Sequence, residues 1–215
     1  HSQYLAENTA VIVAGNIRNE KAVIDKIKET FDSLRGGQPR VQPKVIEEQM
    51  RPAMVHEERS TDQTHLILGF RAFGKNDPRI WAASLLSTIL GGGMSSRMFL
   101  EIREELGLAY HISTSFDDFS RYGYFATYAG VPHAKFEKAI RAILGEYAKI
   151  RRSGVPQSEL NKARDFVKGT TLIALESSSS LATFIGGEEI LTGRAITVDE
   201  VFSKLDAITP AEIQA

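Results

Sequence analysis

The apolar positions of the first 50 residues follow two different periods. Residues 9–15 form a short apolar, β-branched run, which is typical of a buried strand. Apolar residues then recur at helical spacing between Asn19 and Gly36-Gly37, so the pattern predicts a helix that Asn19 caps and the glycines end. One strand and one helix cannot bury a core by themselves, so this opening part must pack on something else.

A polar stretch with three prolines separates this part from the rest of the chain. Residues 38–52 show no convincing period, which is typical of an extended linker. We therefore predict a strand-helix segment over 1–38, a linker over 39–50 and a second domain over 51–215. The second domain is expected to be truncated at its end, since its last helix has barely begun when the sequence stops.

Strand patterns dominate the first half of the second domain. The candidates are 53–57, 63–72, 109–116 and 122–129. The last two are joined by a short polar connection, so they predict an antiparallel hairpin.

Helical patterns surround these strands and fill the remainder. Asp77-Pro78 and Ser95 or Ser96 begin two of them, Pro132 opens a long one, and further helices are expected at 156–167, 175–191, 197–205 and from Thr209 onwards. We predict an α+β fold in two layers, a mostly antiparallel sheet with helices on one face.

Composition and charge exclude several classes of protein. The 215 residues carry a formal net charge of -1, with no strong excess of basic side chains. That balance argues against a nucleic-acid binder, and no RNA-binding motif accompanies the aromatic strands. No apolar run reaches the roughly 20 residues that span a membrane. There are no cysteines, so thiolate metal sites are excluded.

The five histidines do not form a metal-site pattern. They are His1, His56, His65, His111 and His133. A zinc site needs three or four protein ligands, and only His133 and Glu137 share a helical face, without a third ligand nearby. No HExxH or HxxEH motif occurs.

Two other features carry candidate chemistry. Gly91-Gly92-Gly93 lies before a helix start at Ser95, where backbone N–H groups can hold an anion; the simpler alternative is a turn that needs positive φ. Arg103 and Tyr110 flank Gly107, and both side chains can donate hydrogen bonds to a carbonyl oxygen or an oxyanion. Neither feature is specific by itself.

Residues 91–110, GGGMSSRMFLEIREELGLAY, closely resemble a signature of the second domain of M16 zinc metallopeptidases. The family includes pitrilysin, insulin-degrading enzyme and mitochondrial processing peptidase. The hairpin around Tyr122-Gly123-Tyr124 is also similar, and residues 1–15 resemble the end of the family's first domain. The resemblance covers nearly the whole chain.

The resemblance implies specific roles. Arg103 and Tyr110 match the pair that binds substrate backbone and stabilises the tetrahedral intermediate. Gly91, Gly92, Gly93 and Ser95 match a substrate-binding region, although here it is much shorter than the glycine-rich loop of processing-peptidase α subunits. The family's HxxEH zinc site and its glutamate base are absent, so this chain alone is predicted to bind no zinc and to be inactive.

The resulting hypothesis is the substrate-binding, C-terminal portion of a zinc-dependent M16 metalloendopeptidase that hydrolyses peptides. The resemblance implies that zinc and the general base come from a missing N-terminal segment or a partner subunit, within a homo- or heterodimer. The alternative is a non-catalytic structural or partner subunit of an M16 complex. No nucleic-acid partner is expected, and both the bacterial cytoplasm and the periplasm remain open as locations.

Overall fold

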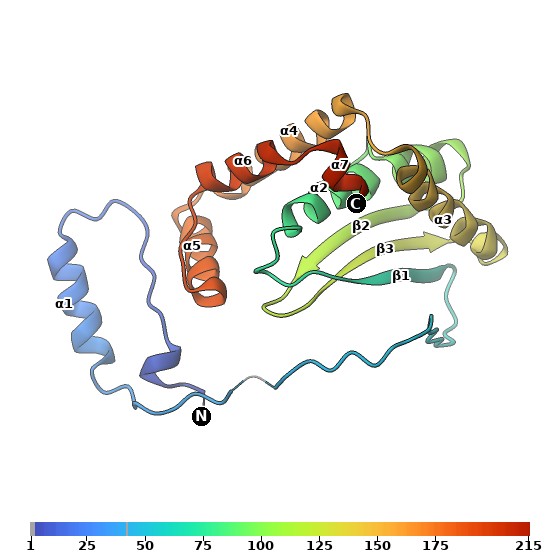
Figure 1. Cartoon of the computed structure of the whole chain (residues 1–215). Helices are drawn as coiled ribbons and strands as arrows, with labels where there is room; N and C mark the ends of the chain where they lie inside the picture. Colours follow the sequence, from blue (N-terminus) through green and yellow to red (C-terminus); the bar gives the residue numbers. More distant parts are fainter. Residues whose placement is uncertain (1–2, 42) are drawn as a thin grey trace. The chain divides into compact units, whose positions relative to one another are not determined.

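The computed structural model describes residues 3–41 and 43–215 (Figure 1). Contacts group these residues into two units. One unit comprises the described residues up to Ile46 together with Thr171–Thr197, and the other comprises Glu47–Thr170 together with Val198–Ala215. Within the described residues, no helix is long and apolar enough to cross a membrane.

The second unit is built around an antiparallel sheet of β1 (Thr64–Ala72), β2 (His111–Asp118) and β3 (Gly123–Val131). The strand order is β1-β3-β2, so β3 pairs with both neighbours. The predicted hairpin is formed by β2 and β3. Alternate residues point to opposite faces of such a sheet, and the apolar ones gather on one face.

Helices cover that apolar face. Figure 1 shows α2 (Ile80–Gly91) and α3 (Phe136–Ser153) against the strands, and α2 also contacts α6 (Val198–Ala207) and α7 (Pro210–Gln214). The core also takes Leu160 from α4 (Gln157–Ala174). Its largest fully buried apolar side chains are Leu85, Leu90, Met98, Ile102, Leu108, Val131, Ile143, Leu160 and Leu205. The predicted α+β fold, with helices on one face of an antiparallel sheet, is confirmed.

The opposite face of the sheet is exposed. In β1, Ile67 keeps 70% of its surface accessible, and in β3 Tyr124 keeps 41%. Across the strands, Ile67 lies opposite Tyr128, which in turn lies opposite Ser113. This face therefore presents aromatic and polar side chains to the solvent.

The first unit contains a short 3-10 turn (η1, Ala6–Asn8), α1 (Glu20–Phe31) and α5 (Ser178–Thr192). The predicted cap is confirmed, because the side chain of Asn19 accepts a hydrogen bond from the amide of Ala22. The predicted strand over 9–15 is wrong: the segment forms no strand, since a strand requires a hydrogen-bonded neighbour and this unit supplies none among its described residues. The predicted strand over 53–57 is absent as well.

The boundary between the units falls inside the predicted linker, 39–50. However, residues 171–197 contact the N-terminal segment, although they lie within the predicted domain 51–215. Local patterns do not report such long-range contacts. The assignment of 1–38 and 51–215 to two successive domains stays a prediction.

Candidate functional site

Arg103 projects from a short helix whose other side is buried. The helix, η2 (Phe99–Glu105), is a π-helix, and the Leu106 amide donates to the carbonyl of Glu101 over 2.9 Å. Ile102 is fully buried and fixes the helix on the core. Arg103 remains exposed, with its guanidinium carbon 4.7 Å from the centre of the Phe99 ring. The buried neighbour therefore sets the direction in which Arg103 points.

A sharp turn leads from this helix into β2. Gly107 has a φ of +56°, which only glycine adopts readily. The Leu108 amide then donates to the carbonyl of Ile102 over 2.8 Å, and Lys135 Nζ donates to the Gly107 carbonyl over 2.9 Å. Leu108 and Ala109 are buried, so the turn is held by the core and by hydrogen bonds.

Tyr110 follows this turn and joins the sheet. Its amide donates to the carbonyl of Gly130 over 2.9 Å, while its side chain stays 59% exposed. Within the described residues, no hydrogen bond or ring contact joins Tyr110 to Arg103. Arg103 has a weak ion pair with Glu104, whose Oε1 lies 3.7 Å from Nε. Both side chains thus present hydrogen-bond donors to solvent near one end of the sheet.

The glycines at the end of α2 have packing roles. A Cβ on Gly91 would lie 2.3 Å from the backbone nitrogen of Thr114, so only glycine lets α2 approach β2 this closely. Gly92 has a φ of -77°, and none of the three is in the left-handed region. The interpretation as a turn that needs positive φ is therefore wrong.

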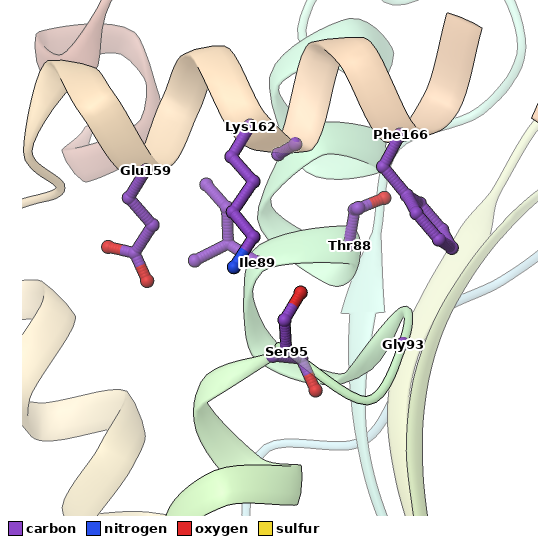
Figure 2. A pocket seen from close by; sticks show the side chains of 9 residues that line it. Thr88, Ile89, Gly93, Ser95, Glu159, Lys162 and Phe166 are labelled. Carbon is purple, nitrogen blue, oxygen red and sulfur yellow. The ribbon is translucent and has the colours of Figure 1, made fainter. Parts of the chain in front are cut away.

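A cavity of about 70 Å³ lies beside these glycines (Figure 2). Figure 2 shows Glu159, Lys162 and Phe166 of α4 pointing towards the turn that carries Gly93 and Ser95. The complete lining is Thr88, Ile89, Gly93, Ser95, Ser96, Glu159, Lys162, Ala163 and Phe166. Sequence spacing did not indicate that α4 closes over this turn.

An ion pair bounds the cavity. Arg97 donates from Nε and Nη2 to the two oxygens of Glu159, over 2.8 and 2.6 Å. Hydrogen bonding to Glu159 raises the pKa of Arg97 despite the opposing effect of burial. Ser96 is buried, and its hydroxyl has no hydrogen-bond partner among the described residues. The pair ties the turn after α2 to α4.

A second hollow lies on the exposed face of the sheet. It is an open groove of about 520 Å³. Its lining residues are Gln49, Ile67, Gly69, Phe70, Arg71, Ser113, Ser115, Tyr124, Ala126 and Tyr128. The groove is open above Gly69, since nothing lies within 4 Å of a Cβ built on this residue.

The four histidines that the structure describes do not assemble a metal site. His133 bonds through Nδ1 to the Thr64 hydroxyl and through Nε2 to the Thr61 carbonyl. His1 lies outside the described residues. Over 3–41 and 43–215, no group of three or more His, Asp or Glu residues is placed to hold a metal ion.

Comparison with known proteins identifies the family. The model of the Peptidase M16 inactive domain matches residues 1–167. An uncharacterized zinc protease of Mycobacterium leprae is 31% identical over 99% of this chain and 48% of its own length. One of Streptomyces coelicolor is 29% identical over 99% of this chain and 47% of its own length.

A solved structure has the same fold. A protease from Helicobacter pylori superposes with a TM-score of 0.81 at 22% identity, over 94% of this chain and 49% of its own. The chain therefore spans about half the length of the proteins that it matches. These matches show that the chain belongs to the M16 peptidase family, within which it corresponds to the inactive domain.

Proposed function

We propose that this chain is the substrate-binding portion of a zinc-dependent M16 metalloendopeptidase that hydrolyses peptides. The names of the relatives as zinc proteases support the reaction class. The observation that carries the proposal is the exposed pair Arg103 and Tyr110, held near one end of the sheet with donors directed to solvent.

The pair suits the electrostatic demands of peptide hydrolysis. Attack on a peptide carbonyl moves negative charge onto its oxygen, and donors placed in advance stabilise that charge. Arg103 offers a permanently charged guanidinium, and Tyr110 offers a phenolic O–H. Because buried neighbours and the turn at Gly107 hold their backbone, little ordering is needed when a peptide binds.

The zinc ligands must come from elsewhere in this proposal. The described residues of this chain do not fit a zinc site, which needs three protein ligands and an open position. We assign the ligands and the general base to an N-terminal segment or a partner subunit, in a homo- or heterodimer. The half-length match to the relatives supports this division.

The glycine turn is assigned to substrate binding in the same proposal. Gly93 and Ser95 line the 70 Å³ cavity together with Lys162, and Gly91 and Gly92 directly precede them in the sequence. Gly91 is needed for packing, so peptide contacts are expected from Gly93 and Ser95. A purely structural M16 subunit is the second candidate, and the names of the relatives do not favour it.

The decisive experiment measures kcat/KM of this chain assembled with the zinc-bearing portion. Arg103→Ala and Tyr110→Phe should each lower kcat/KM, since one lost oxyanion donor costs about 10²–10³ in rate. Arg141→Ala and Tyr122→Phe are matched controls, because both side chains are exposed and lie outside the site. Unchanged kinetics in both site variants would overturn the assignment.

The isolated chain provides a separate test. We expect it to bind no stoichiometric zinc in equilibrium dialysis and to cleave no peptide. Chelator-sensitive proteolysis by the isolated 215 residues would contradict the proposed division of labour.

A further inference from the structure

Two histidines flank one glycine on the exposed face of the sheet. His65 of β1 and His111 of β2 both lie opposite Gly130 of β3. Since Gly130 has no side chain, the space above the middle strand is open to the side chains of its neighbours. The side chains of Gln63 and His65 occupy it: a Cβ on Gly130 would lie 2.9 Å from Gln63 Oε1, 3.7 Å from His65 Nδ1 and 3.8 Å from His65 Cε1.

Tyr128 connects the two imidazoles. Its hydroxyl lies 2.6 Å from His65 Nδ1, and the two rings are stacked with centroids 5.9 Å apart. Its ring centre is also 5.5 Å from that of His111. Three side chains from three strands therefore meet above one point of the sheet.

The hydrogen bond between His65 and Tyr128 leaves further donors of both side chains for a ligand. When the His65 imidazole is protonated, Nδ1–H donates to the Tyr128 oxygen. Nε2–H and the Tyr128 O–H then have no partner among the described residues. His111 adds a second imidazole, which lies across Gly130 from His65 in the sheet register. Two imidazoles and a hydroxyl thus offer several hydrogen-bond donors within a small area of this face.

No acidic group of the chain competes for these donors. Among the described residues, no carboxylate lies within ion-pair distance of either imidazole. The charged and titratable groups elsewhere on this face include Arg71, Asp117 and Tyr124, six positions along the strands, or about 20 Å away, and Glu47, which accepts a hydrogen bond from Arg71.

The backbone connects the pair with one of the two proposed catalytic residues. Tyr110 immediately precedes His111, and its amide bonds to the carbonyl of the same Gly130 that the histidines flank. The 520 Å³ groove starts at Tyr128 and runs along the same face. An extended peptide lying in the groove would carry its side chains or its end past the histidines.

We propose that His65, His111 and Tyr128 form a subsite for a carboxylate of the peptide, supplied by an acidic side chain or by the C-terminus. The inference rests on the proposed peptide-binding function and specifies the chemistry that this face selects. Histidine gains its charge as the pH falls from 8 to 5. Selection for the carboxylate is therefore strongest at the acidic end of that range.

The test uses fluorescein-labelled ten-residue peptides and the full 215-residue chain, with affinity read by anisotropy. One peptide has a central Asp and an amidated C-terminus, a second has Asn in that place, and a third combines Asn with a free C-terminal carboxylate. At pH 5.5 one or both carboxylate peptides should bind about 5- to 10-fold more tightly than the neutral peptide, as charge-assisted hydrogen bonds do. The carboxylate peptide that binds more tightly than the neutral peptide identifies the source of the carboxylate, a side chain or the C-terminus.

Substitutions of the three side chains then test whether they cause the preference for the carboxylate peptides. His65→Gln and His111→Gln keep an N–H donor without the charge, so each should reduce the preference at pH 5.5, and pH 8 should do the same in the wild type. Tyr128→Phe should weaken it as well. His56→Gln is the matched control, because His56 is exposed and lies outside the sheet.

The outcomes separate the two proposals. If all three peptides bind equally at both pH values, the carboxylate subsite is wrong while peptide binding stands. A preference that persists in the His65→Gln, His111→Gln double variant overturns the assignment to these residues. Failure of every peptide to bind at either pH contradicts the proposed function itself, and the subsite with it.

Discussion

Replacing Gly91 by alanine tests whether the close approach of α2 to β2 contributes to the stability of this unit. An added Cβ would meet the Thr114 amide nitrogen at 2.3 Å, its Oγ1 at 2.5 Å and its Cβ at 2.7 Å. Unstrained contacts are near 3.5 Å, so the helix and the strand must separate by about 1 Å. Two of the three atoms belong to a buried side chain that cannot rotate away freely.

The magnitude follows from two opposing effects. Overpacking a core costs about 1–3 kcal/mol, whereas Gly to Ala in a helix gains up to about 1 kcal/mol. The net loss at Gly91, the last residue of α2, is therefore about 1–2 kcal/mol. In a chain of this size that loss lowers Tm by about 2–8 °C.

Gly145 is the matched control. It lies within α3, and nothing is found within 4 Å of a Cβ built on it. Gly145→Ala should therefore stabilise by about 0.5–1 kcal/mol through backbone entropy and helix propensity. Thermal melts followed by circular dichroism compare the two variants. If Gly91→Ala raises Tm as Gly145→Ala does, the packing argument is refuted.

Three further predictions concern charges and buried hydroxyls. The guanidinium and amide of Arg79 lower the pKa of Asp77 to about 2, so the ionised carboxylate stabilises the fold above pH 4 and this contribution is lost as the pH falls towards 2; Asp77→Asn should flatten the change in the urea midpoint between pH 5 and 2.5. Glu159→Gln should cost about 1–2 kcal/mol in urea unfolding, because it leaves the half-buried Arg97 without its charged partner. Burial raises the pKa of Tyr147, whose hydroxyl bonds to a threonine of β3, and Tyr147→Phe should cost about 1 kcal/mol, whereas a stability gain would contradict this.

Strands of the sheet were predictable from local runs of β-forming residues bounded by turn residues, whereas the presence of a pairing partner was not. The pattern over 63–72 predicted β1 to within one residue of the observed Thr64–Ala72, because one face of the strand is buried. The same reasoning failed over 9–15, where composition favoured a strand and no neighbouring strand is present among the described residues.

The candidate site was predictable only in part. The spacing of Arg103 and Tyr110 around Gly107 was visible in the sequence, and the buried residues Ile102 and Leu108 hold the backbone near each of them. The pairing of His65 with His111 was not visible. It depends on the register of two strands against β3, and register is set by packing across the whole sheet.

In the π-helix that carries Arg103, the number of residues determines the direction in which the side chains point. A π turn contains one residue more per hydrogen-bonded ring than an α turn. Such turns are rare in proteins as a whole, and those that occur are often found at functional sites. Deleting one residue of Phe99–Glu105 would let an ordinary α-helix form, and every later side chain would rotate relative to Ile102. In evolutionary terms, this segment tolerates substitution more readily than a change of length, so natural variants should differ here in residue type and seldom in residue number.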